Sequence, residues 1–256
     1  MSQNLNSSKL IALMIPCTSN SRSEWERMKD TYLFHYSLKT FLATCDKEHN
    51  YILYVGYDKN DRIFANPEEQ KVIQVFEKAF KFLKVVFMEM DAPKGHLTKM
   101  WNQIFRRAYD DGCDYFYQCG DDICFTTKGW INDCISILEY NHNIGITGPM
   151  NNNHLILTQG FVSRQHMKIF GEFFPETILN WGCDDWYNHV YQPYFLYVLK
   201  NHYCSNEGGQ PRYAVDGNPN FGKNYQENVK KLRDDVREMA IKDQDKIFDY
   251  MEHNDF

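Results

Sequence analysis

The sequence lacks the cysteine spacings and the blocks of positive charge that mark several common classes of protein. Its 256 residues include eight cysteines, but no two of them form a Cys-x-x-Cys pair, which argues against a zinc ribbon or a redox motif. Several cysteines lie in apolar stretches, so we expect reduced thiols in an intracellular compartment. The net charge is −6 and no Lys/Arg block is present, which argues against a nucleic-acid partner recognised through its phosphates.

Long hydrophobic runs are missing as well. The apolar run Leu10–Ile15 is too short for a signal-peptide core or a membrane span, and no later segment reaches spanning length. We therefore expect a cytoplasmic protein without a transmembrane segment. There is also no phosphate-binding P-loop, no Ser-His-Asp pattern and no zinc-ligand spacing that would indicate an unrelated hydrolase.

What the sequence does contain is an alternation of apolar, strand-like runs with stretches of helical periodicity. The predicted strands are Leu10–Ile15, Tyr51–Val55, Lys84–Met88, Tyr115–Cys119 and Ile144–Thr147. The predicted helices between them are Trp25–Leu42, Glu68–Phe82, Leu97–Tyr109 and Lys128–Tyr140. This alternation indicates an α/β fold, with a mostly parallel, doubly wound sheet and helices on both faces. The remaining predicted elements are a strand within Leu155–Ser163, helices near Gln165–Phe170 and Asp184–Tyr191, and a long helix over Tyr225–Tyr250.

Two adjacent carboxylates follow the fourth predicted strand directly, in Gly120-Asp121-Asp122. Ionised side chains beside a buried strand are costly unless a cation pairs with them, and carboxylate oxygens suit Mg²⁺ or Mn²⁺. A capped turn is the ordinary alternative, because Asp is common there. Ligands of doubly wound sheets bind at the carboxyl ends of the strands, where the loops Pro16–Arg22 and Tyr57–Asp61 are also expected. This position favours the metal interpretation.

The strand with its Gly120-Asp121-Asp122-Ile123 turn resembles the aspartate motif of glycosyltransferases of the GT-A fold. The segment Lys94–Asn102 resembles the helix start that precedes this motif. Pro16-Cys17-Thr18-Ser19 resembles a nucleotide-contacting loop, and Asp58 matches an acidic position that meets the base. The chain is also similar to uncharacterised GT-A-like proteins of large DNA viruses.

The resemblance implies a Rossmann-like, mostly parallel sheet of the GT-A type with helices on both faces and a C-terminal helical extension. It implies one catalytic domain over residues 1–224, with a nucleotide-binding half over about 8–127 and an acceptor half over about 128–224, and a C-terminal helix over 225–256.

A GT-A resemblance also implies an activity. The protein is expected to be a hexosyltransferase that moves a sugar from a nucleotide-diphosphate sugar, a UDP-sugar first of all, to a hydroxyl of a glycan, glycoprotein or other acceptor. Mn²⁺ or Mg²⁺ is the implied cofactor, with Asp122, Asp121 and His202 as its ligands. The implied nucleotide-sugar contacts are Pro16, Cys17, Thr18, Ser19, Arg22, Asp58, Lys99, Asn102, Gly120, Asp121 and Arg212. The family pattern is Asp-x-Asp, so Gly120 leaves one carboxylate of the usual site missing.

Asn180-Trp181-Gly182-Cys183-Asp184-Asp185-Trp186 resembles the segment that carries the catalytic base of inverting GT-A enzymes. Either Asp185 or Asp184 is then the base that deprotonates the acceptor hydroxyl, with Asp185 favoured, although both also suit the N-cap of the following helix. Trp181 and Trp186 are candidates for stacking on a sugar ring, or for ordinary core packing.

Weaker candidates each have an ordinary interpretation beside the functional one. His202 is a possible third metal ligand, but a lone histidine is often structural. Arg212 and Lys223 suit a diphosphate clamp, or plain surface charge. The run Asn151–Asn153 is a candidate for hydrogen bonds to the sugar.

Two other functions stay open. A nucleotidyltransferase that makes a sugar-nucleotide would use a similar sheet, but such enzymes carry a glycine-rich loop after the first strand, and Pro16–Arg22 has no glycine. A nucleotide- or carbohydrate-binding protein without turnover is the other alternative, and the incomplete Asp-x-Asp pattern keeps it open.

Overall fold

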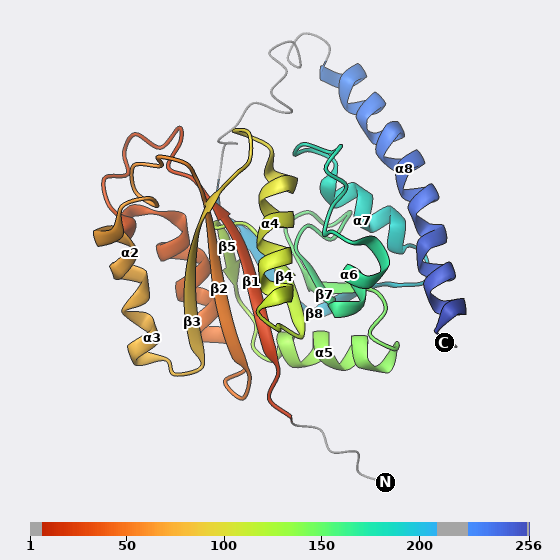
Figure 1. The fold of residues 1–256 in the computed structure, drawn as a ribbon, viewed down its shortest axis with the longest axis horizontal. Helices are drawn as coiled ribbons and strands as arrows, with labels where there is room; N and C mark the ends of the chain where they lie inside the picture. Colours follow the sequence, from red (N-terminus) through yellow and green to blue (C-terminus); the bar gives the residue numbers. More distant parts are fainter. Residues whose placement is uncertain (1–6, 209–224, 255) are drawn as a thin grey trace.

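A computed structural model describes residues 7–208, 225–254 and 256 of the protein. They fold into an α/β structure whose eight-stranded sheet has the order β3-β2-β1-β4-β7-β6-β8-β5 (Figure 1). The strands are β1 (Leu10–Cys17), β2 (Asn50–Asp58), β3 (Leu83–Met90), β4 (Tyr115–Gln118), β5 (Ile123–Phe125), β6 (Ile146–Met150), β7 (Gly160–Ser163) and β8 (Leu196–Asn206). The helices are η1 (Met28–Asp30), η2 (Leu33–Leu38), α1 (Lys39–Thr44), α2 (Pro67–Gln74), α3 (Phe76–Ala79), α4 (Leu97–Asp110), α5 (Trp130–Tyr140), α6 (Arg164–Phe170), α7 (Cys183–Tyr191) and α8 (Tyr225–His253).

The half of the sheet built from the first four strands is parallel. β1 pairs with β2 on one side and with β4 on the other, and β2 pairs with β3. The carboxyl ends of these strands lie at one edge, so the segments that follow β1, β2 and β4 meet there. The other half is mixed, because β7 is antiparallel to β4 and β6, β8 is parallel to β6, and β5 is antiparallel to β8. The predicted α/β fold with a mostly parallel sheet is confirmed.

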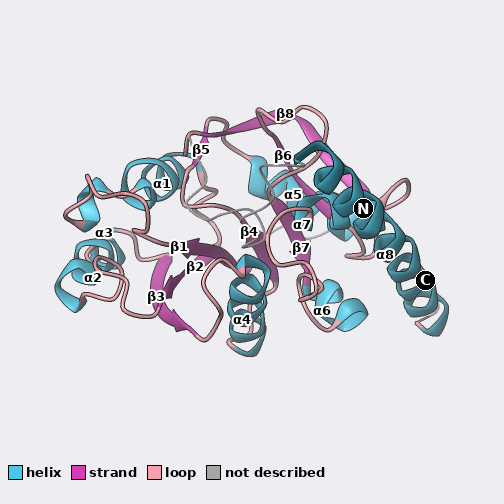
Figure 2. Cartoon of the chain, turned by 90° about the horizontal axis from the view of Figure 1, so that it is seen from above, coloured by secondary structure: helices cyan, strands magenta, loops and turns pink. Residues whose placement is uncertain are grey.

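Each face of the sheet carries a hydrophobic core, and β1 shows how its sequence achieves this. Successive side chains of a strand point to opposite faces. Leu13 and Ile15 belong to a core that includes α1 and α5, whereas Ala12 and Met14 belong to a second core that includes α4 and α7. Figure 2 shows α1 and α5 on one side of the sheet and α4 and α6 on the other. An unbroken apolar run is what a strand covered on both faces requires.

The predicted C-terminal helix is present as α8, which runs along α7 (Figure 1). Val236, Ala240 and Ile247 recur at helical spacing and are buried against the domain. Trp186 of α7 donates its indole N–H to Asp243 Oδ2 of α8 (2.9 Å). Among the described residues, no helix is long and apolar enough to cross a membrane.

One predicted helix begins later than expected, and two strands were not predicted. The helix predicted over Trp25–Leu42 begins only at Leu33, because Asp30 Oδ2 accepts the N–H groups of Glu26 (3.0 Å) and Arg27 (2.9 Å) and closes a separate turn. β5 and β8 were not predicted. The interior of β8 is polar and half-exposed, so it has no apolar periodicity to reveal it.

Candidate active site

The Gly120-Asp121-Asp122 turn follows β4 and is held at both ends by one serine. Ser37 Oγ donates to the Gly120 carbonyl oxygen (3.0 Å) and accepts from the Ile123 N–H (3.1 Å). Ser37 is buried, so its bond from the Ile123 N–H is shielded from water. The Asp121 side chain is fully buried, whereas Asp122 lines a cavity.

β8 brings a further polar group to this turn. Because β5 pairs with β8, Asn206 lies opposite Ile123, directly after Asp122. The Glu207 N–H donates to the Asp122 carbonyl oxygen (2.9 Å). The Asn152 amide donates to the Asn206 carbonyl (3.1 Å), and the Asn206 N–H donates back to Asn152 Oδ1 (3.1 Å). The end of β8 and the loop after β6 are therefore both tied to the aspartate turn.

The loop after β1 is fixed by carboxylates from the end of β2 and from the loop that follows it. Asp61 accepts the Ser19 N–H at Oδ2 (2.7 Å) and the Ser19 hydroxyl at Oδ1 (2.9 Å). Asp58 Oδ2 accepts the Asn20 side-chain amide (3.0 Å). Asp61 is buried, so its bonds are strong charge-assisted ones in a site shielded from water. They position Pro16-Cys17-Thr18 in the cavity wall.

A buried amide fixes the loop that leads into α7. Asn102 of α4 is fully buried, and its Oδ1 accepts the N–H groups of Phe173 (3.1 Å) and Phe174 (2.9 Å). Its Nδ2 donates to the Phe174 carbonyl (2.8 Å). The chain then enters α7, whose first turn carries the acid pair Asp184-Asp185.

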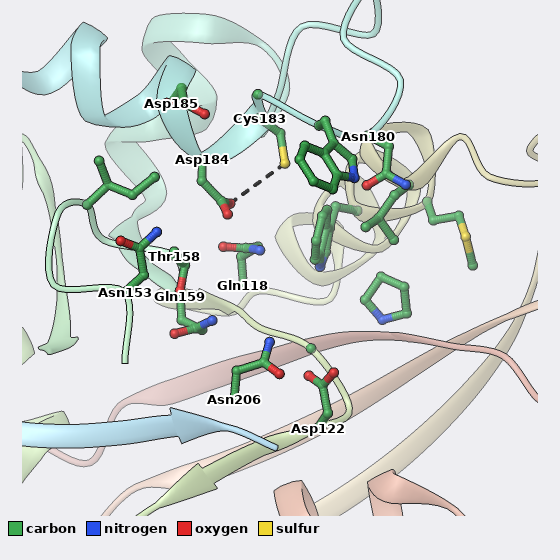
Figure 3. A pocket seen from close by; sticks show the side chains of 18 of the residues that line it. Gln118, Asp122, Asn153, Thr158, Gln159, Asn180, Cys183, Asp184, Asp185 and Asn206 are labelled. Atoms are coloured by element: carbon green, nitrogen blue, oxygen red, sulfur yellow. Dashed lines mark hydrogen bonds between the residues drawn. The ribbon is translucent and has the colours of Figure 1, made fainter. Parts of the chain in front are cut away.

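These parts enclose a cavity of about 550 Å³. Figure 3 shows Asp122 and Asp184 on opposite walls, with the amides of Gln118 and Gln159 between them. Apart from the carboxylates, the polar lining consists mainly of amide side chains. Amides and carboxylates offer both donors and acceptors, so the cavity suits a ligand rich in hydroxyl groups.

Asp184 has an unusual protonation equilibrium. Burial and, second, the charge of Asp185 raise the pKa of Asp184 to about 7, against the opposing hydrogen bonds from Cys183 and Tyr187. The Tyr187 hydroxyl donates at 3.3 Å and the Cys183 thiol at 3.7 Å. The Asp185 carboxylate makes no hydrogen bond or ion pair with another described residue. A carboxyl with a pKa near 7 is suited to take up a proton at neutral pH.

The donor set at Asp122 fits a hard divalent cation. Within the described ranges, no group of three or more His, Cys, Asp or Glu side chains forms a site made of protein ligands alone. Asp122 lies in the cavity wall with the Asn206 amide beside it (Figure 3). One carboxylate with neutral oxygens suits Mg²⁺ or Mn²⁺, which retain waters and take substrate phosphates as ligands.

The cavity gathers part of the predicted site. The predicted residues that line it are Pro16, Cys17, Thr18, Gly120, Asp122, Asn152, Asn153, Trp181, Asp184 and Asp185. The predicted residues that do not line it are Ser19, Arg22, Asp58, Lys99, Asn102, Asp121, Asn151, Trp186 and His202. Arg212 and Lys223 lie outside the described residues.

Three of the predicted residues that do not line the cavity have structural partners instead. His202 contacts Asp133 Oδ2 through Nε2 (2.7 Å) and Thr127 Oγ1 through Nδ1 (3.1 Å), outside the cavity. Trp186 is buried in the core beside α8, and Asn102 holds the loop before α7. These positions do not support the metal, sugar and nucleotide contacts that the sequence predicts for them.

Sequence reasoning missed several polar residues of the cavity, namely Gln118, Thr158, Gln159, Asn180, Asn206 and Arg233. Gln118 gave a signal, since it is the one polar side chain of the apolar strand β4. Asn206 gave none, because β8 was not predicted. Arg233 gave none either, because it is one of many charged residues in α8.

No protein-family model and no curated protein matches the sequence. Solved structures do match the fold of the chain. Residues 1–349 of S. aureus TarS align over 76% of this chain and 60% of that chain, with 13% identity and a TM-score of 0.50. The complex of the same TarS fragment with UDP-GlcNAc aligns over 80% and 62%, with 12% identity and a TM-score of 0.52. GalNAc-T7 with UDP, GalNAc and Mn²⁺ aligns over 84% and 45%, with 9% identity and a TM-score of 0.53.

These neighbours are GT-A-type glycosyltransferases. The fold is of the GT-A type. At such low identity the likeness shows the fold alone, and the aligned part spans less than two thirds of each neighbour.

Proposed function

We propose that the protein is a glycosyltransferase that moves a sugar from a UDP-sugar to an acceptor hydroxyl, with a divalent metal at Asp122 and with inversion at the sugar. The observation that carries this proposal is a cavity in a GT-A fold with Asp122 on one wall and Asp184 on the other. Two neighbours of the same fold are complexes that contain UDP-GlcNAc, or UDP with GalNAc and Mn²⁺, and they support the choice of donor.

The donor belongs at the Asp122 end of the cavity. Pro16-Cys17-Thr18 and Gly120 form the wall against which the nucleotide would lie, and Asp122 would hold the metal. When bound, that metal would neutralise the diphosphate and stabilise the charge that develops on it as the sugar leaves. The lining amides would orient the sugar through its hydroxyl groups.

Asp184 is the better candidate for the base, although the sequence favoured Asp185. Its carboxylate points into the cavity (Figure 3), and its pKa of about 7 is close to the optimum for a general base at neutral pH. The acceptor hydroxyl would give its proton to Asp184 as its oxygen attacks the sugar carbon. Attack from the wall opposite the departing diphosphate leads to inversion.

Calorimetric titration of UDP, with and without Mn²⁺, tests the donor site. Mn²⁺ is expected to tighten UDP binding about tenfold or more in the wild type and to have little effect in Asp122→Ala, because a charge-assisted interaction with the metal is lost. Glu207→Gln, an exposed carboxylate next to the site, is the matched control. A wild type that binds UDP equally well with and without Mn²⁺ would remove the metal from the proposal.

Release of UDP from UDP-GlcNAc tests turnover and the identity of the base. Asp184→Asn is expected to slow it by a factor of about 10² to 10⁴, and Asp185→Asn by much less. The wild-type rate should rise with pH through about 7 as Asp184 loses its proton. The reverse order of the two variants would assign the base to Asp185, and UDP binding without any turnover would indicate a binding protein.

A further inference from the structure

Arg233 of α8 lines the same cavity, and of the described residues that line it, this one alone is positively charged. Asp122, Asp184 and Asp185 are the negatively charged ones. The Arg233 guanidinium forms no hydrogen bond or ion pair with any other described residue. An arginine at the wall of this cavity favours the binding of an anionic ligand over a neutral one. Its guanidinium offers the forked donors that carboxylates and phosphates accept.

The packing of α8 places Arg233 at one end of the cavity. Gly182 precedes the first turn of α7, and a β-carbon at that position would lie 3.1 Å from Val236 Cγ2 and 3.6 Å from Leu232 Cγ. Arg233 is adjacent to Leu232 and one turn before Val236, so it belongs to the part of α8 that packs on Gly182, and it lines the cavity together with the acid pair that follows Gly182. Asp122 is on the opposite wall (Figure 3).

Arg233 is not the partner of the acid pair. The pKa of Asp184 is set by burial, by the charge of Asp185 and by hydrogen bonds from Cys183 and Tyr187, with no contribution from Arg233. A guanidinium in contact with that carboxyl would lower its pKa. The charge of Arg233 therefore remains available to a ligand that enters at this end.

We infer that Arg233 recognises an anionic group, a carboxylate or a phosphate, on the acceptor. The inference rests on the proposed function, in which the donor diphosphate lies at the Asp122 end and the acceptor lies beside Asp184. An anionic group on the acceptor would accept hydrogen bonds from the Arg233 guanidinium while the reacting hydroxyl of the acceptor faces Asp184. The carboxylates of the cavity would repel the same anion without Arg233, so this side chain acts as a specificity determinant.

Acceptor binding to the wild type in the presence of saturating UDP and Mn²⁺ tests the inference. The probes are methyl glucoside, methyl glucuronide and glucose 6-phosphate, which differ in carrying no anion, a carboxylate or a phosphate, and binding is followed by protein NMR. The variants are Arg233→Gln and, as the matched control, Arg237→Gln. Arg237 is exposed one turn farther along α8 and does not line the cavity.

The wild type and Arg237→Gln are expected to bind at least one anionic probe about tenfold more tightly than methyl glucoside, and Arg233→Gln is expected to lose that preference. Whichever anionic probe is preferred identifies the anion as a carboxylate or a phosphate. Equal binding of all three probes to the wild type, or an unchanged preference in Arg233→Gln, would overturn the inference and leave the proposed function standing.

Binding of UDP itself separates the remaining outcomes. If Arg233→Gln weakens UDP binding tenfold while Arg237→Gln does not, the side chain contacts the donor and the acceptor assignment is wrong. If the wild type binds no UDP, the proposed function fails, and this inference fails with it.

Discussion

Gly208 lies against the side chain of Asp122, so closely that a β-carbon at position 208 would stand 2.6 Å from Asp122 Cγ and 2.8 Å from Asp122 Cβ. A β-carbon at Gly120 would overlap Asp122 Oδ1 as well, but it would stand 3.5 Å from Cγ. The glycine at the first position of the aspartate motif therefore has a physical reason. It leaves the space that the Asp122 carboxylate occupies.

Substitutions of Gly208 and Gly120 form a matched pair, because a β-carbon at either position would crowd the side chain of Asp122. Gly208→Ala is expected to weaken Mn²⁺-dependent UDP binding about tenfold, because Asp122 cannot move its Cβ by rotating its side chain and overpacking costs ~1–3 kcal/mol. Gly120→Ala is expected to weaken it less, because a rotation of the carboxylate relieves the overlap. Calorimetry measures both, with Glu207→Ala as the control on the same segment.

Binding of UDP by Gly208→Ala at the wild-type level, with the same response to Mn²⁺, would show that Asp122 does not hold the metal in this orientation. A fall in thermal stability without a change in UDP binding would show that the substitution affects the fold and not the metal site.

Asp184 gives a prediction about stability and pH. Its pKa is raised to about 7 in the folded protein, so between about pH 4 and pH 7 the folded state holds a proton that the unfolded state has lost. The wild type therefore loses stability as the pH rises through this window. The stability of Asp184→Asn relative to the wild type should grow from near zero at pH 4 to about 2 kcal/mol at pH 8, after a discount for partial exposure.

Urea unfolding at several pH values measures this difference. Asp234→Asn, an exposed carboxylate of α8, is the control and should show no comparable trend. A difference between Asp184→Asn and the wild type that is the same at pH 4 and pH 8 would contradict the raised pKa of Asp184.

Substitution of Asn102 tests whether this residue positions a loop or contacts the nucleotide. Asn102→Ala leaves the N–H groups of Phe173 and Phe174 without their acceptor in a buried site, so the free energy of unfolding is expected to fall by about 3 kcal/mol. UDP affinity should stay within about twofold of the wild type, since Asn102 does not line the cavity. Urea unfolding and calorimetry provide the two readouts.

The neighbouring amide is the control. Gln103 also bonds to backbone, through Asp91, but at the surface, so Gln103→Ala should cost under about 1 kcal/mol. A large loss of UDP affinity in Asn102→Ala, with stability unchanged, would restore the nucleotide contact that the sequence predicts.

The sequence predicted those features of the fold and the site that depend on the local surroundings of a single residue or run. The unbroken apolar run of β1 predicts a strand covered on both faces, and it lies at the centre of the parallel half of the sheet. Asp122 stands out because a carboxylate next to a buried strand requires an explanation, whereas Asp184 stands out through the resemblance of Asn180–Trp186 to a segment that carries a catalytic base. The same argument cannot tell that Asp121 turns into the core while Asp122 turns into the cavity, because that depends on the turn held by Ser37.

Other parts of the site depend on contacts between distant segments. Asn206 reaches Asp122 only because β5 pairs with β8, and β8 has no periodic pattern. Arg233 reaches the cavity only because α8 packs against Gly182. Single-residue chemistry predicts neither of these, since each needs a long-range pairing that local sequence does not encode.

His202 is the last of the predicted metal ligands, and its surroundings lead to a prediction of no effect on metal binding. Its imidazole lies between Asp133 Oδ2 (2.7 Å) and Thr127 Oγ1 (3.1 Å), and it does not line the cavity that contains Asp122. His202→Ala should leave the Mn²⁺ dependence of UDP binding within about twofold of the wild type. The free energy of unfolding should fall by about 1 kcal/mol or less, because the partner Asp133 is largely exposed. Asp133→Asn should produce a loss of similar size, since both variants remove the same pair. If His202→Ala instead abolishes the response to Mn²⁺ while Asp133→Asn keeps it, His202 must reach the metal in the bound state, contrary to the position described above.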